Sequence, residues 1–314
     1  MKVLSLFDGM ACGMLAMQRA GIKVDRYVAY EIDKYAVQTS SHNFPMIEHR
    51  GDVFKADFTE FFGFDAVIGG SPCTKWSNAR TTGRETMPEG IGWELFMQFV
   101  RAVKEAQPKW FIYENNKSMS KEIRKTISET FGFEPDCINS GLVSAQNRWR
   151  LYWVGKRNED GSYSKVEIAQ PTDRRIVISD ILDIPHSVHL IMDKPFQVVS
   201  KNNSGVVALL EIKATDIVKR VYGINGKAPT LTTCGGGHRE PKIMQGNLVR
   251  KLSVNECKRL QTVPNSYEFP VSNSQAYKML GNGWTVDVIA HLITSIINSD
   301  EAEEVRDYIG VKYY

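Results

Sequence analysis

Two patterns of apolar and polar positions alternate over the first 155 residues of the chain. Short apolar runs predict strands, and segments whose apolar positions recur at three and four predict helices between them, most clearly over Trp93–Ala106. Strands separated by helices favour an α/β fold, with a mostly parallel sheet that is covered on both faces. The predicted strands are Lys2–Phe7, Arg26–Tyr30, Asp65–Ile68, Lys109–Tyr113 and Arg150–Val154.

The pattern changes near Asn158. From there to Asn247, Gly, Asn, Pro and short β-like pieces dominate, which predicts a smaller, loop-rich domain. Helical spacing returns over Ser253–Gln261 and Thr285–Asn298, and the second of these carries one apolar stripe that is typical of a core helix. We therefore predict three parts: 1–157, 158–250, and a tail, 251–314, that packs back on the first part.

The composition is that of an ordinary globular protein. Hydrophobic residues make up 42% and charged residues 24% of the 314 positions, which excludes a disordered or fibrous chain. No stretch approaches the roughly 20 uninterrupted apolar residues of a membrane span. The chain begins directly as a strand, with no basic and apolar leader, so we expect neither export nor a membrane partner.

Positive charge is concentrated in one stretch. The formal net charge is +3, from 39 basic and 36 acidic residues, but positions 219–251 hold seven basic residues and one acid, or +6. A positive patch of this kind favours a polyanionic partner, and a solvated face without a partner is the alternative. The seven residues are Lys219, Arg220, Lys227, Arg239, Lys242, Arg250 and Lys251.

The five cysteines point to a reduced compartment. No pair lies within four residues, so zinc-finger and thioredoxin spacings are absent and we predict no metal site. An odd number in a chain of this size indicates free thiols in a cytoplasm-like compartment, and one of them is a candidate nucleophile. The five are Cys12, Cys73, Cys137, Cys234 and Cys257.

Polar residues follow the first predicted strands, where α/β sheets bind their ligands. The turn "SLFDGMACG" places Asp8 and Gly9 after the first strand and Gly13 at the start of a helix, while Glu31 and Asp52 end the next two apolar stretches. Each acid alone is more often a helix cap or a surface charge. Together they indicate an adenosine-containing cofactor. Because the glycine spacing is not G-x-G-x-x-G, it argues against a nicotinamide dinucleotide and an oxidoreductase.

Candidate catalytic residues follow the later strands. Cys73 stands after "DAVIGGSP", where a nearby positive group can make its thiol nucleophilic, although a lone cysteine is usually a small buried apolar residue. Glu114 follows the next strand as a candidate acid. Arg148 and Arg150 alternate on one face and can clamp an anion, a structural ion pair being the alternative. A polar, glycine-bearing stretch over 74–93 has the composition of a lid.

Taken in order, these motifs resemble the cytosine carbon-5 DNA methyltransferases over nearly the whole chain. "FDGMACG" is similar to the family's first S-adenosylmethionine motif, "GGSPC" to its Pro-Cys motif, "ENN" to its Glu-Asn motif and "QNRWR" to its Gln-x-Arg-x-Arg motif. "PTLTTCGGGH" resembles the Thr-Leu segment of the target recognition domain. "RKLSVNECKRLQTVP" and "GNGWTVDVIAHL" resemble the two C-terminal motifs.

The resemblance implies a Rossmann-like methyltransferase sheet, the cofactor S-adenosyl-L-methionine and a role for each matching residue. Cys73 would attack carbon 6 of a flipped cytosine, Glu114 would protonate the ring nitrogen, and Arg150, supported by Arg148, would contact the pyrimidine carbonyl. It further implies a catalytic part over 1–157 and a target recognition domain over 158–250. The implied cofactor residues are Phe7, Asp8, Gly9, Gly13, Glu31, Ile32, Asp52, Val53, Pro72, Asn282 and Trp284. The implied DNA contacts are Ser77, Arg80, Arg84, Thr230, Thr232, Cys234, Gly235, Gly236, Gly237 and Arg239.

Several positions depart from the family's commonest bacterial pattern, among them "ENN", "SPC", "QTVP" and "GNGW", but each catalytic group is present. We expect a monomeric enzyme that methylates a short double-stranded DNA site, in the cytoplasm of a bacterium or a phage-infected host, with or without a cognate restriction endonuclease. The alternatives are a tRNA cytosine-5 methyltransferase and a regulatory relative without activity.

Overall fold

The computed structural model describes the chain except residues 73–75, 77–82, 184–189, 200–204, 237 and 311–314, together with the side chains of 300–310. Its contacts divide the chain into two compact units. Unit 1 comprises 1–138, 149–170 and 288–314, and unit 2 comprises 139–148 and 171–287. Residues 251–287 are thus grouped with unit 2, whereas the sequence predicted one tail from 251 onward. The chain passes from unit 2 back to unit 1 between Arg148 and Trp149.

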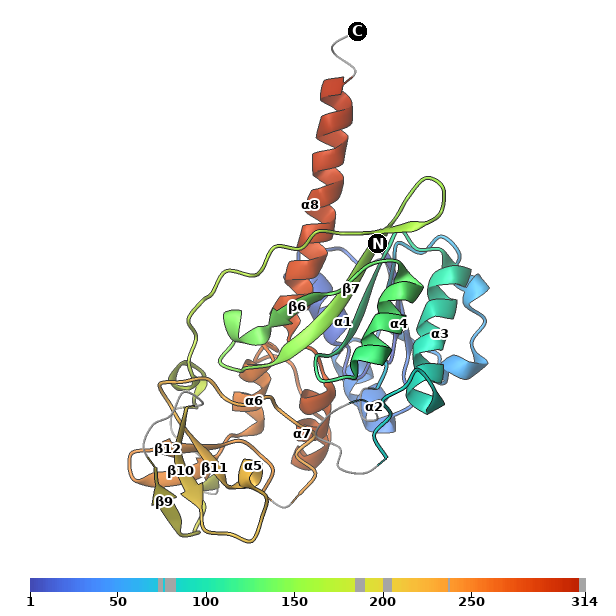
Figure 1. Cartoon of the computed structure of the whole chain (residues 1–314). Helices are drawn as coiled ribbons and strands as arrows, with labels where there is room; N and C mark the ends of the chain where they lie inside the picture. The colour runs from blue at the N-terminus through green and yellow to red at the C-terminus, as the bar shows by residue number, and fades with distance from the viewer. Residues whose placement is uncertain (73–75, 77–82, 184–189, 200–204, 237, 311–314) are drawn as a thin grey trace. The chain divides into compact units, whose positions relative to one another are not determined.

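Unit 1 is built on an eight-stranded sheet, which confirms the predicted α/β class (Figure 1). Its order is β3-β2-β1-β4-β5-β7-β6, with β8 paired to β7. The pairs from β3 through β5 are parallel, while β7 runs antiparallel to β5. The strands are β1 (Lys2–Leu6), β2 (Arg26–Tyr30), β3 (Glu48–His49), β4 (Ala66–Gly69), β5 (Trp110–Asn116), β6 (Asp136–Asn139), β7 (Trp149–Arg157) and β8 (Tyr163–Lys165).

Apolar side chains of the helices pack against this sheet. Helices α3 (Gly90–Ala106) and α4 (Lys121–Phe131) lie side by side over one face (Figure 1), and Phe96 and Phe99 of α3 contact Phe131 of α4 edge to face. Their apolar positions join those of β1, β4, β5 and β7 in one buried cluster. Helix α4 begins where the Ser120 hydroxyl accepts from the Ile123 amide and ends at Gly132, whose φ of 85° suits glycine. The other helices of unit 1 are α1 (Cys12–Arg19), α2 (Lys34–Asn43) and most of α8 (Val286–Gly310).

Unit 2 carries a second sheet of five short strands, in the order β13-β12-β11-β10-β9. A small cluster around Ala208, Leu210, Val221 and Val249 forms its core. A long connection, residues 224–241, joins β11 to β12, as the loop-rich composition predicted, whereas β12 and β13 form a hairpin. The strands and α-helices described in unit 2 are β9 (Phe196–Val198), β10 (Val206–Leu210), α5 (Asp216–Lys219), β11 (Arg220–Gly223), β12 (Lys242–Gln245), β13 (Leu248–Lys251), α6 (Val254–Leu260) and α7 (Asn273–Asn282).

One stretch of the described helices, Asn273–Ser299, is long and apolar enough to cross a membrane by length and composition alone, with a mean hydropathy of 1.2. Of its most apolar window, 61% is buried inside the protein. The buried side chains of Val286, Ile289 and Ile293 belong to the apolar stripe that the sequence analysis assigned to the core. The hydropathy of this stretch is therefore that of a core helix.

Candidate active site

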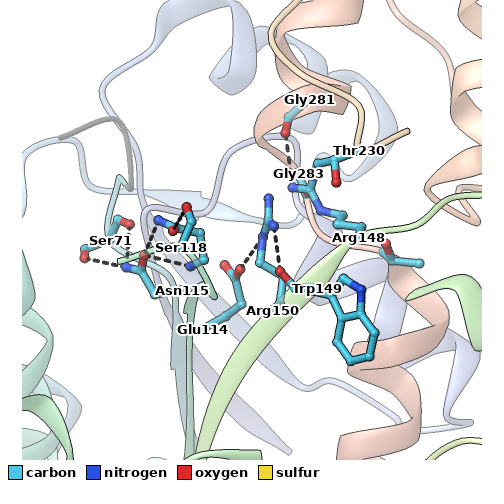
Figure 2. Close-up of polar contacts among 12 residues, drawn as sticks. Ser71, Glu114, Asn115, Ser118, Arg148, Trp149, Arg150, Thr230, Gly281 and Gly283 are labelled. Atoms are coloured by element: carbon cyan, nitrogen blue, oxygen red, sulfur yellow. Dashed lines mark hydrogen bonds and ion pairs between the residues drawn. The ribbon is translucent and has the colours of Figure 1, made fainter. Parts of the chain in front are cut away.

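A carboxylate and a guanidinium meet where β5 ends. Glu114 Oε1 lies 3.0 Å from Arg150 Nε, and both side chains are largely buried, at 12% and 14% exposed (Figure 2). The strand pairing explains the contact: Asn116 lies opposite Arg150, so Glu114 and Arg150 share one face of the sheet. The sequence predicted that Glu114 follows the strand. Instead β5 continues to Asn116, because its pairing with β7 extends that far.

A buried hydrogen-bond network ties this part of β5 to the turn after β4 (Figure 2). Asn115 Nδ2 donates to the Ser71 carbonyl at 3.2 Å and to the Tyr113 hydroxyl at 3.1 Å. The Ser71 and Tyr113 hydroxyls are 2.7 Å apart. Since Asn115 follows Glu114 and Ser71 precedes Cys73 by two residues, the network fixes the start of the Pro-Cys turn beside the acid. Sequence analysis missed this network, although an asparagine and a tyrosine within an apolar strand are a signal for it.

A buried carboxyl group, that of Asp8, lies just after β1. Asp8 Oδ1 accepts hydrogen bonds from Ser5 Oγ at 2.6 Å and from the Tyr27 hydroxyl at 2.7 Å. Asp8 Oδ2 is buried and has no hydrogen-bond partner among the described residues. Burial raises the pKa of Asp8 to about 6, against the opposing effect of its two donors. A buried acceptor without a donor indicates that a ligand group completes this site.

The turn around Asp8 is shaped for close approach. A Cβ on Gly13 would lie 2.5 Å from both Ile68 Cδ1 and Tyr27 Oη, so only glycine lets α1 pack this tightly on the sheet. Gly9 donates its amide to Glu31 Oε2 at 2.8 Å, and Glu31 Oε1 accepts from the amides of Ile32 and Asp33. Helix α1 has no side-chain cap at its N-terminus among the described residues. The predicted glycine-rich turn is thus joined to the end of β2 by a carboxylate.

Further predicted cofactor residues follow β2 and β3. Ile32 is 78% exposed, which is unusual for an isoleucine and leaves an apolar surface free for a flat ring. Asp52 caps a short 3-10 helix (Val53–Lys55) by accepting from the Phe54 amide, as the alternative reading of a helix cap expected. Asp8, Glu31, Ile32 and Asp52 all follow strands of the parallel part of the sheet, so the residues present fit an adenosine-containing cofactor.

Comparison with known proteins assigns the chain to a family. The family model described as C-5 cytosine-specific DNA methylase matches residues 1–298. The chain belongs to this family. Among curated proteins it is 28% identical to the type II methyltransferase M.FnuDI of Fusobacterium nucleatum, covering 99% of both chains, and 26% identical to M.HhaI of Haemophilus parahaemolyticus, covering 95% of both. The chain is therefore a DNA cytosine-5 methyltransferase by family, as the motif order predicted.

Solved structures support the fold of this methyltransferase. A DNA modification methyltransferase encoded within an E. coli prophage superposes with a TM-score of 0.69, at 20% identity over 95% of this chain and 99% of that one. The Dnmt2 methyltransferase of S. pombe superposes with a TM-score of 0.65, at 16% identity over 95% and 98%. Both likenesses concern the arrangement of helices and strands.

Unit 2 holds the predicted cofactor residues Asn282 and Trp284 and the predicted DNA contacts of the Thr-Leu segment. Asn282 is exposed and Trp284 half-buried, so both side chains are accessible, and Thr230 and Thr232 are exposed in the Thr-Leu segment. Cys234, a predicted DNA contact, is buried instead: its thiol donates to the Thr232 carbonyl, and burial raises its pKa to about 11. Gly235, Gly236 and Arg239 remain exposed.

The two arginines of "QNRWR" have different partners. Arg150 pairs with Glu114 in unit 1, whereas Arg148, 4% exposed, donates to backbone carbonyls of unit 2. The sequence predicted both guanidiniums at one site on one face. Their spacing in the sequence could not show that the two arginines have different partners. Strand β7 begins at Trp149, so Arg150 lies in the strand and Arg148 lies before it. Trp149 itself is 46% exposed, with the Lys117 ammonium 4.3 Å from its ring centroid, a cation–π pair that sequence analysis missed.

Two of the seven basic residues of the predicted positive patch over 219–251 are buried and so do not contribute to a positive surface. Lys242 and Arg250 are buried, at 2% and 3% exposed, and Arg250 forms an ion pair with the fully buried Glu256. Among the described residues, only Lys219 and Arg239 of the seven have no polar partner within the chain. The other partners are Asp216 for Arg220, Glu240 for Lys251, the carbonyls of His238 and Glu240 for Lys242, and those of Gly141, Ser144 and Ile176 for Lys227.

Four predicted site residues lie outside the described residues: Cys73, Ser77, Arg80 and Gly237. Of their neighbours, Pro72 is exposed, and Arg84 donates to the carbonyls of Trp76 and Ser118. Across the residues that are described, no group of three His, Cys, Asp or Glu side chains could hold a metal ion. The four described cysteines are free thiols.

Proposed function

We propose that this methyltransferase modifies carbon 5 of a cytosine in a short double-stranded DNA site, using S-adenosylmethionine and a covalent adduct of Cys73 at carbon 6. The observation that supports this most is the Glu114–Arg150 pair, joined through Asn115 to the turn that leads into Cys73. Carbon 6 of cytosine is a poor electrophile, so a nucleophile and an acid must act on the ring together.

The residues have distinct tasks in this proposal. Cys73 forms a bond to carbon 6 while Glu114 gives a proton to ring nitrogen 3, which converts the ring to an enamine. Arg150 holds Glu114 in place and donates to the pyrimidine carbonyl. The bound cofactor supplies the methyl group that carbon 5 accepts. Water then takes the proton from carbon 5, and the electrons of that bond expel the Cys73 thiolate from carbon 6. The proton on ring nitrogen 3 returns to Glu114, which restores the aromatic ring.

The target base must leave the duplex for this chemistry, since carbon 6 is not accessible within a stack, and extrusion costs about a few kcal/mol. Exposed residues of the Thr-Leu segment, Thr230, Thr232, Gly235 and Gly236, are our candidates for DNA contact, with Arg239 at a phosphate. We place Asp8, Glu31, Ile32, Asp52, Asn282 and Trp284 at the cofactor, together with Phe7, Gly9, Val53 and Pro72.

We also propose a monomer that acts where bacterial or phage DNA is found, in the cytoplasm. The curated relatives include type II methyltransferases, whose name implies a partner nuclease, and orphan methyltransferases of Bacillus phages, whose name implies none. A cognate endonuclease is therefore an open part of the proposal, decided by whether expression of the chain protects DNA from a nuclease encoded beside its gene.

The test combines sequencing with variants. Bisulfite sequencing of DNA from cells that express the chain should show 5-methylcytosine at one short sequence, and Cys73→Ser should abolish it. A duplex with 5-fluorocytosine at the target should form a stable covalent complex with the wild type and not with Cys73→Ser. Cys137→Ser, at a half-buried cysteine of β6, is the matched control and should retain both.

Two results would overturn the proposal. The first is full methylation by Cys73→Ser. The second is methyl transfer to tRNA and not to duplex DNA, which would favour the tRNA enzyme.

Glu114→Gln should slow single-turnover methyl transfer by about 10²-fold or more, because a general acid typically contributes 10²–10⁴-fold.

A further inference from the structure

Arg148 binds two segments of unit 2 at once. Its Nη1 donates to the Leu231 carbonyl at 3.1 Å. Its Nη2 donates to the carbonyls of Gly281 and Gly283 at 3.1 and 2.9 Å (Figure 2). The first carbonyl belongs to the Thr-Leu segment, and the other two flank Asn282. Because a guanidinium is planar and rigid, it fixes the spacing between the carbonyls that it holds.

A second polar bridge joins the same segments. The Leu231 amide donates to Gln146 Oε1 at 2.6 Å, and Gln146 Nε2 donates to Gln261 Oε1 at 3.2 Å. Gln261 Nε2 in turn donates to the carbonyls of Leu280 and Gly283 at 2.6 and 3.0 Å. Both glutamines are fully buried, so each of these bonds would be costly to leave unmade.

The two segments also touch backbone to backbone. A Cβ on Gly281 would lie 2.1 Å from the Thr232 carbonyl oxygen and 2.7 Å from the Thr233 amide nitrogen. No side chain fits between them. A displacement of residues 230–232 must therefore either move residues 281–283 or break charge-assisted hydrogen bonds in a buried environment.

We propose that Arg148 is a positioning residue that couples occupancy of the cofactor site to binding of DNA. This rests on the proposed function, which assigns Asn282 and Trp284 to the cofactor and Thr230 and Thr232 to DNA. These accessible side chains stand on the two segments that Arg148 holds. A ligand that orders one segment thereby orders the other, so each ligand binds more tightly when the second is present.

The size of the effect is measurable. Couplings between sites in proteins are typically 5- to 150-fold in affinity and are the same in either direction. Three charge-assisted bonds link the segments, and Lys in place of Arg148 would keep a buried cation but lose the fixed fork. We expect Arg148→Lys to reduce the coupling at least threefold, while each separate affinity changes less than this.

The experiment uses the full chain, S-adenosylhomocysteine as an unreactive cofactor probe, and a duplex with the methylated sequence found above. Titration calorimetry gives the Kd of the probe with and without DNA, and of DNA with and without the probe. The ratio is the coupling factor, and it should exceed about fivefold for the wild type and agree between the two routes. A merely structural arginine would change stability without changing this ratio.

Lys227→Met is the matched control. Lys227 also donates to three backbone carbonyls of unit 2, those of Gly141, Ser144 and Ile176, but it holds neither of the two segments. We expect it to lose stability and keep the coupling factor. If Arg148→Lys does not fold, Gln146→Ala tests the same link by removing the bond to the Leu231 amide, with the same expected fall in coupling.

Three outcomes would overturn the inference: a wild-type coupling factor of one, an unchanged factor in a folded Arg148→Lys or Gln146→Ala variant, or an equal fall in Lys227→Met. Each is distinct from failure of the proposed function. A wild type that methylates DNA normally but shows no coupling refutes only the role of Arg148, whereas a wild type that does not methylate DNA refutes the proposed function first.

Discussion

The buried carboxyl of Asp8 should make folding stability depend on pH in an unusual direction. Most carboxylates stabilise a protein as they ionise, but burial raises the pKa of Asp8 to about 6 from an ordinary 3.8. The folded protein therefore holds this proton more tightly than the unfolded chain does. The stability from the protonated group is fully present below about pH 4, falls as pH rises from 4 to 6, and is lost above pH 6.

The magnitude follows from the shift. The pKa of Asp8 differs by about two between the folded and unfolded states, and at 1.36 kcal/mol per pKa unit this changes the free energy of unfolding by about 3 kcal/mol. This applies to a group that is only 8% exposed, so screening by solvent is slight. Asp8→Asn removes the ionisation and keeps an oxygen for the Ser5 and Tyr27 donors. The free energy of unfolding of Asp8→Asn minus that of the wild type should therefore be larger at pH 7.5 than at pH 4, by up to about 3 kcal/mol.

Urea unfolding of both proteins at half-unit steps from pH 4 to pH 8 measures this difference. Tyr27→Phe provides a second perturbation of the same carboxyl: because the tyrosine hydroxyl lowers the pKa of Asp8, its removal should move the transition above pH 6. A difference between wild type and Asp8→Asn that stays flat across this range would refute the reasoning. Asp8→Asn should also weaken cofactor binding at pH 7.5, a trade of function for stability.

Three further perturbations test packing and charge in unit 2. Gly281→Ala should destabilise the protein by about 3 kcal/mol, because the added Cβ would overlap the Thr232 carbonyl. The control Gly235→Ala should leave the urea midpoint unchanged, because nothing lies within 4 Å of a Cβ at that position. Equal midpoints for the two variants would refute the close approach at Gly281. Arg250→Met should cost about 3–5 kcal/mol by leaving a buried carboxylate unpaired and should not change the salt dependence of DNA binding. Arg239→Ala should leave stability unchanged and lower the slope of log K against log salt by about one, and the reverse pattern would contradict the assignment.

The sheet could be predicted from the sequence because strands buried on both faces appear as continuous apolar runs. Arg26–Tyr30 matches β2 in full, and the first and third predicted strands match β1 and β4 to within a residue at each end. The end of β5 could not be predicted in this way. Asn115 and Asn116 are polar, and they stay in the strand only because β7 pairs with them, which is a long-range contact.

The candidate site divides along the same line. Asp8 and Glu31 could be identified because they follow strands, but the raised pKa of Asp8 depends on burial that no local pattern reports. The predicted positive patch over 219–251 is wrong at Lys242 and Arg250 for a related reason, since a sum of charges does not distinguish a solvated cation from a buried one. Here a local signal was present: Ser253 and Glu256 form a capping box at the start of α6, six residues from Arg250, which places a carboxylate within its reach.

The motif "QNRWR" shows how five residues can serve two purposes. Gln146 and Arg148 bind the backbone of unit 2, Arg150 binds Glu114 in unit 1, and the chain changes unit between Arg148 and Trp149. Substitutions of Arg148 and Arg150 should therefore have different effects on the rate of methyl transfer. An affinity-coupling defect in Arg148→Lys disappears when DNA and cofactor are both saturating, because binding then no longer limits the rate. A defect in Arg150→Lys persists at saturation, because it lies at the acid that acts on the ring; single-turnover rates at saturating and subsaturating ligand separate the two.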